Sequence, residues 1–135
     1  MSVSISELRG ITPEILEGLN KKGLKDSDDL LEAVKTPKQR RELASELNAD
    51  TRALLELGNR ADLARINGIG AVFSDLLEYA GVDTVKELAM RRADNLHAKM
   101  AEVNEEKNLA QRLPTQDDVE AWVAAAKDLP KVLEY

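Results

Sequence analysis

The sequence predicts an all-α fold, a compact helical domain of two tandem units related by an internal repeat. Leucine, isoleucine, valine and alanine recur at helical spacing, and no segment alternates polar and apolar residues as a strand would. Residues that cap helices precede these apolar stretches, and glycine or asparagine follows them. The pattern also returns after 58 positions without a gap, since Leu8-Arg9-Gly10-Ile11 recurs as Ile66-Asn67-Gly68-Ile69.

The first unit is expected over about residues 5–58. Each of its helices should open at a side chain that can accept a hydrogen bond from the amides of the first turn. These expected caps are Thr12, Asp26 or Ser27, Thr36 and Asp50. Residues that tolerate a left-handed backbone or weaken a helix should close the helices. The expected ends are Gly23, Asn48 and Gly58.

The second unit is expected over about residues 59–129 and repeats the same devices. Asn59 should cap a short helix that leads through Ile66 into a second glycine turn. Further helices are expected over Ala71–Ala80, after Thr84, from about Asp94 and after Thr115.

The composition is that of a single domain spanning residues 1–135, or of two small units that share a core. The net charge is −6, with −1 on residues 1–66 and −5 on residues 67–135. A dedicated nucleic-acid binder usually shows the opposite sign, because cations neutralise the phosphates. Cysteine is absent, and neither a membrane-spanning stretch nor a secretory signal is visible. We therefore expect a cytoplasmic protein.

The second glycine turn has the spacing of a helix-hairpin-helix motif, in which two helices meet at a glycine-apolar-glycine turn. Leu63, Ile66 and Gly68-Ile69-Gly70 occupy its positions, and Ile69 should point inward. Amides at such a turn can hold a phosphate or carboxylate oxygen. The residues expected to bind an anion or nucleic acid here are Asn67, Gly68 and Gly70, assisted by Arg60 and Arg65.

Two features of the turns favour a protein partner over DNA. DNA-binding hairpins commonly carry a lysine or arginine after the second glycine, but the matching residues here are Glu14 and Val72. The first turn also has Thr12 in place of the second glycine. The sequence therefore predicts a non-catalytic binding or adaptor module that contacts a protein. The alternative is weak, sequence-independent contact with a nucleic-acid backbone through the second hairpin. The oligomeric state is left open.

Catalysis, metals and cofactors have little support in the sequence. His97 is the only histidine, and without cysteine a transition-metal site would lack ligands. No nucleophile or phosphate-binding lysine occurs in a recognisable motif. Trp122 and Phe73 lie on apolar helical stripes, which indicates core positions. We expect no catalytic residue, metal site or cofactor.

Several runs of residues, in combination, carry a resemblance to a known family. These are Ala61–Gly70, Leu76-Leu77, Ala80–Ala89, Asn95–Met100, Glu102–Glu105, Leu113-Pro114, Val119–Val123 and Ala126-Lys127. Together they resemble the bacterial domain-of-unknown-function family numbered 4332. The resemblance extends from about Ile5 to Leu129 and implies tandem helix-hairpin-helix-like units in one helical domain. It implies no particular activity.

Overall fold

The computed structural model describes residues 2–135, and within them all regular structure is helical, with no strand. This confirms the all-α prediction. A short 3₁₀ helix, η1, comes first, and the α-helices follow it. Their bounds are η1 Ile5–Glu7, α1 Pro13–Lys21, α2 Ser27–Ala33, α3 Pro37–Leu47, α4 Thr51–Leu63, α5 Ala71–Tyr79, α6 Val85–Ala89, α7 Ala93–Lys107 and α8 Gln116–Asp128. Within this part of the chain, no helix has the length and apolar content needed to cross a bilayer.

Most helices begin where the sequence indicates, because the predicted caps form. Thr12 accepts a hydrogen bond from the Ile15 amide at 3.2 Å, and Asp26 accepts one from the Asp29 amide at 2.9 Å. Thr36 at the start of α3 and Thr115 at the start of α8 form reciprocal capping boxes with the residue three positions later. These caps satisfy first-turn amides that would otherwise lack a partner.

The prediction that a helix ends at Gly58 and another begins at Asn59 is wrong. A single helix, α4, runs through both residues. A Cβ placed on Gly58 would lie 3.0 Å from Cγ2 of Val34 and 3.3 Å from Cδ2 of Leu133. Glycine is therefore present here because two side chains pack against the helix backbone, not because the helix stops.

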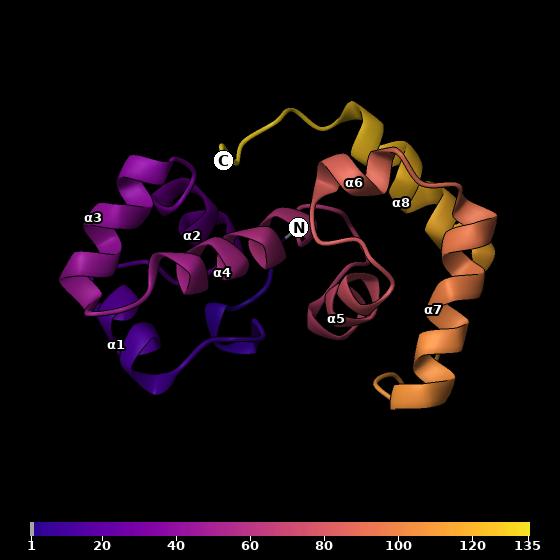
Figure 1. The fold of residues 1–135 in the computed structure, drawn as a ribbon, viewed down its shortest axis with the longest axis horizontal. Coiled ribbons are helices and arrows are strands. Elements are labelled where there is room, and N and C mark those ends of the chain that lie inside the picture. The colour runs from indigo at the N-terminus through magenta and orange to yellow at the C-terminus, as the bar shows by residue number, and fades with distance from the viewer. Residues whose placement is uncertain (1) are drawn as a thin grey trace.

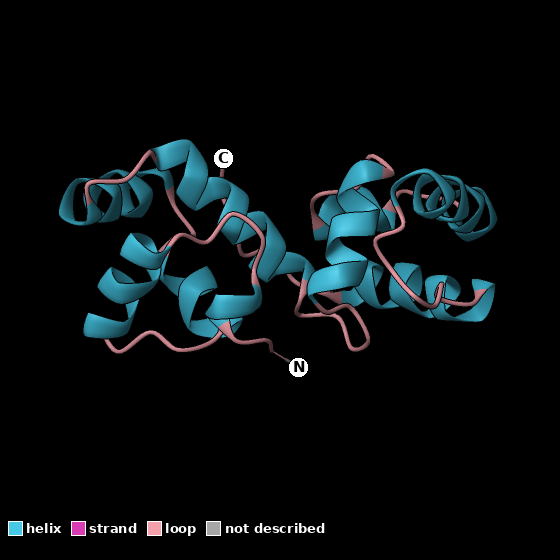
Figure 2. Ribbon diagram, turned by 90° about the horizontal axis from the view of Figure 1, so that it is seen from below, coloured by secondary structure: helices cyan, strands magenta, loops and turns pink. Residues whose placement is uncertain are grey.

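The buried apolar side chains form two separate clusters, which divide within α4. Leu54, Leu57 and Ala61 belong to the first cluster with side chains of η1 and α1–α3, whereas Leu63 belongs to the second with α5–α8. The division falls shortly after the boundary expected between residues 58 and 59. Two groups of helices joined by α4 are visible in Figures 1 and 2.

The chain after α8 returns from the second group to the first, and we call residues 129–135 the C-terminal strap (Figure 1). Leu133 is 3% exposed and belongs to the first core. The Glu134 amide donates to the Lys35 carbonyl at 2.7 Å, and Nη2 of Arg40 donates to the Glu134 carbonyl at 2.6 Å. The strap therefore fastens the end of α8 to the first group.

The secondary structure follows the 58-residue offset of the sequence in its first elements. Helices α1 and α5 each have nine residues and begin 58 positions apart. The backbone φ is +94° at Gly10 and +92° at Gly68, and it is +82° at Gly23 and +96° at Gly81. From the repeat we predict that the hairpins around Gly10 and Gly68 superpose and are related by a pseudo-two-fold axis.

Candidate functional site

The second hairpin turn connects α4 to α5, and its apolar residues hold it against the second core. Ile66 and Ile69 are 2% and 3% exposed, so the inward position expected for Ile69 is observed. The Ile69 amide donates to the Ile66 carbonyl at 3.1 Å, which closes the turn around Gly68. Asn67 and Gly68 lie at the surface between these two buried side chains.

Gly68 lies directly against the core tryptophan. Its φ of +92° is in the left-handed region, and a Cβ there would lie 3.1 Å from Nε1 of Trp122. Trp122 is 4% exposed, as expected for a core position. Phe73 is only partly buried, with its ring centre 5.5 Å from that of Trp122. One edge of Phe73 thus remains part of the surface.

The start of α5 presents backbone amides without a side-chain cap. Gly70 is the residue before the helix, and no side chain accepts a hydrogen bond from the first turn. The first amides of a helix have no partner within the helix, so those after Gly70 can donate to a bound acceptor. A hollow of about 590 Å³ lies in front of them, lined by Val3, Glu7, Gly68, Gly70, Ala71, Val72 and Phe73. Val72 is 45% exposed there.

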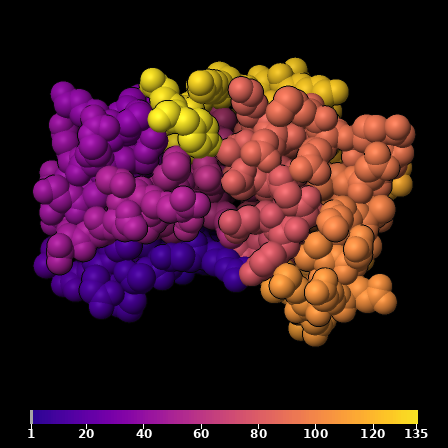
Figure 3. Space-filling view, in the orientation of Figure 1, coloured from indigo at the N-terminus to yellow at the C-terminus, as the bar shows by residue number. Residues whose placement is uncertain are grey.

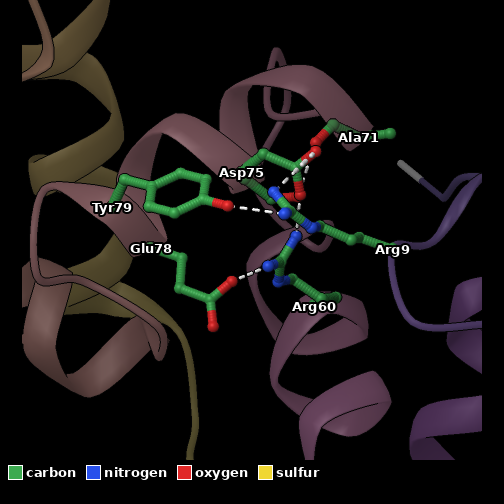
Figure 4. Close-up of polar contacts among 7 residues, drawn as sticks. Arg9, Arg60, Ala71, Asp75, Glu78 and Tyr79 are labelled. Atoms are coloured by element: carbon green, nitrogen blue, oxygen red, sulfur yellow. Dashed lines mark hydrogen bonds and ion pairs between the residues drawn. The ribbon is translucent and has the colours of Figure 1, made fainter. Parts of the chain in front are cut away.

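Arg60 lies in the interior of the molecule, where carboxylates from α5 neutralise it. Its side chain is 7% exposed and forms ion pairs with Asp75 and Glu78 (Figure 4). Arg9 of the first group approaches the same cluster, with Nη1 4.0 Å from Oδ2 of Asp75 and its guanidinium 5.0 Å from the ring centre of Tyr79. The cluster joins the first group of helices to α5.

Arg65 is also neutralised within the chain. Its Nη2 lies 2.6 Å from Oδ1 of Asp62, and its Nη1 donates to the Pro130 carbonyl of the C-terminal strap at 2.9 Å. Asp62 is buried and also accepts from the Val85 amide at 3.2 Å. The five predicted site residues therefore do not form one site. Asn67, Gly68 and Gly70 lie together in the turn, whereas Arg60 and Arg65 form ion pairs and hydrogen bonds within the chain.

Sequence reasoning missed the partners of these arginines and the apolar character of the hollow. Asp75 and Glu78 lie three residues apart on α5, a spacing that places both on one helix face, but the sequence does not indicate which cation meets them. His97 is partly buried, with Nε2 2.9 Å from the Pro114 carbonyl. Over residues 2–135, no group of three or more His, Asp or Glu side chains is arranged to hold a metal ion.

The chain was compared with known families and with known proteins. The family described as "Domain of unknown function (DUF4332)" matches residues 9–129. No curated protein and no solved structure matches the chain. Since the match covers most of the sequence, the chain belongs to the family of the domain of unknown function DUF4332.

Proposed function

We propose that this chain is a non-catalytic binding module that contacts another protein through the surface of its second hairpin. The observation that carries the proposal is the internal neutralisation of Arg60 and Arg65. Both are paired with carboxylates of the chain itself, so neither offers a free cation to a phosphate. A protein that binds a nucleic-acid backbone derives most of its affinity from such cations.

The hollow at the start of α5 has the mixed chemistry of a protein contact. Val72 and the edge of Phe73 supply apolar surface, and the amides after Gly70 supply hydrogen-bond donors. A partner side chain can cover the apolar surface, and a partner carbonyl oxygen can accept hydrogen bonds from the amides. The Glu7 carboxylate, which also lines the hollow, repels a phosphate.

Substitution of Val72 by lysine distinguishes a protein partner from the nucleic-acid alternative. Val72→Lys supplies the cation that DNA-binding hairpins commonly carry at this position, and it removes the exposed apolar side chain. It should therefore strengthen contact with a phosphate backbone and weaken contact with an apolar protein surface. Because Val72 is exposed, the fold should tolerate the change.

The experiment has two arms. A photo-crosslinking amino acid at position 72, with an identical one at exposed Ala98 as control, should capture a protein partner only from position 72. Fluorescence anisotropy should show no binding of duplex DNA, single-stranded DNA or RNA at low salt. Binding of these nucleic acids that weakens steeply with salt, and tightens in Val72→Lys, would overturn the proposal.

A further inference from the structure

A second surface, separate from the hairpin hollow, lies between α6, the end of α8 and the C-terminal strap. It is a groove of about 390 Å³ that none of the residues of the hairpin hollow lines. In Figure 3 the strap, in yellow, lies beside the salmon-coloured segment to which α6 belongs. Most of the groove wall is apolar, and its apolar residues include Val85, Ala89, Met90, Ala126, Leu129 and Val132.

Met90 gives this groove an apolar side chain that is open to solvent. It is 70% exposed, the highest value among the exposed large hydrophobic side chains of residues 2–135. Tyr135, at 64%, lines the same groove. An isolated exposed apolar residue needs no explanation, but here two of them border one groove. The unbranched thioether of methionine adapts to differently shaped partners.

The rim of the groove is positively charged, although the protein is acidic. Lys86, Lys127 and Lys131 line it, and none has a carboxylate within 4.0 Å in the described residues. The one acidic side chain that lines it, Asp62, is ion-paired with Arg65. The chain has 25 acidic residues and 19 lysines and arginines, so three lysines without a close partner around one apolar groove mark a local reversal of charge.

We propose that this groove binds an acidic segment of a partner protein. An apolar side chain of the segment enters the groove against Val85 and Met90, and flanking aspartates or glutamates meet the three lysines. Charge complementarity selects an acidic partner, because the rim presents three lysines without a close carboxylate beside an apolar wall. The proposal concerns a separate surface and stands even if the hairpin binds nothing.

The test uses the full chain and a short fluorescein-labelled peptide in which aspartates and glutamates flank a central leucine and phenylalanine. Two control peptides replace either the acidic residues by lysines or the apolar pair by alanines. Anisotropy should show binding of the first peptide alone. The affinity should fall as ionic strength rises, because the contacts at the rim are screened.

A charge-matched pair of triple variants localises the binding. Lys86→Glu, Lys127→Glu and Lys131→Glu together should weaken the affinity by about tenfold or more. The control carries Lys25→Glu, Lys38→Glu and Arg112→Glu, which change the net charge equally at exposed positions outside the groove. It should retain most of the affinity for the peptide. Met90→Ala should also weaken binding, and circular dichroism should show native helicity in every variant.

Three results would overturn the proposal. In the first, the acidic and lysine peptides bind equally. In the second, the two triple variants lose affinity equally, which assigns the effect to net charge. In the third, the peptide does not bind and reversal of the rim lysines converts a dimer to a monomer in sedimentation, which makes a second copy of the chain the occupant.

Discussion

At Gly68 the backbone φ is +92°, and a Cβ would lie 3.1 Å from Nε1 of Trp122. The left-handed backbone strains any L side chain, and the buried indole would have to shift to make room for one. Two positions later, Gly70 has an extended φ of −102°, and no atom lies within 4 Å of a Cβ placed there. The two glycines of the motif therefore have different physical roles.

The substitution Gly68→Val should destabilise the protein by about 2 kcal/mol or more, because a β-branched side chain meets both the strained φ and Trp122. Urea unfolding followed by circular dichroism measures this loss. Gly70→Ser is the matched control and should leave stability unchanged or slightly raised, since serine adopts an extended φ and can cap α5. Equal losses at both positions would contradict this account of Gly68.

Arginines 60 and 65 mark the limit of sequence reasoning at the scale of the residue. Both precede the second hairpin in the sequence, but the sequence could not indicate what their guanidinium groups contact. Asp75 and Glu78 reach Arg60 only because α5 packs against α4. Ion pairing between elements depends on how the elements are placed in space, and local sequence carries little of that information.

At the scale of the element, helix boundaries that depend on local hydrogen bonds were predictable, whereas the boundary expected at Gly58 and Asn59 was not. The caps Thr12, Thr36 and Thr115 form because an N-cap hydrogen bond is local, involving a side chain and an amide three residues later. The predicted break at Gly58 was wrong because glycine is needed there for close packing of Val34 and Leu133, which are distant in sequence. The start of α6 combines a local cap with the burial of a charged side chain.

Thr84 caps α6 by accepting a hydrogen bond from the Glu87 amide at 3.1 Å. Burial raises the pKa of Glu87, and a hydrogen bond with Asp83 acts in the same direction. A carboxyl group whose pKa is raised by folding contributes stability below its unfolded pKa. That contribution is lost as the pH rises through the raised folded pKa.

The variant Glu87→Gln should therefore have a higher melting temperature than the wild type at a pH above the raised pKa of Glu87, where the wild-type carboxylate is charged. The difference should vanish below about pH 4, where the glutamate is protonated in both the folded and unfolded states. Thermal melts across this range measure it. Glu14→Gln, a change at an exposed first-turn glutamate of α1, serves as control. A gain that is constant with pH would exclude titration as its cause.

At the scale of the whole molecule, two cores share one continuous helix. Helix α4 contributes to both clusters, the Arg60 cluster joins the groups near α5, and the C-terminal strap joins them again near α6. The strap also forms one wall of the lysine-rimmed groove. Stability of the first core and the shape of the proposed docking groove therefore depend on the same few residues.

Truncation of Leu133 tests this coupling. Leu133→Ala should cost about 2–4 kcal/mol, because it leaves a cavity beside Gly58 in the first core. Hydrogen–deuterium exchange should show a larger loss of protection in α1–α4 than in α7 and α8. Val123→Ala, which truncates a side chain of the second core, should give the reverse pattern. Equal loss across both groups would indicate that the two cores unfold as one unit.

The sequence by itself determined the helical class, most helix starts and the inward position of Ile69, and its runs of residues indicated the family. The helical class and the helix starts follow from helical periodicity and from hydrogen bonds that span a few residues. Only the tertiary structure decided that the core divides within α4, that the site arginines are neutralised, and that three lysines surround an apolar groove. Each of these depends on contacts between residues far apart in the chain, which the packing of whole helices brings together.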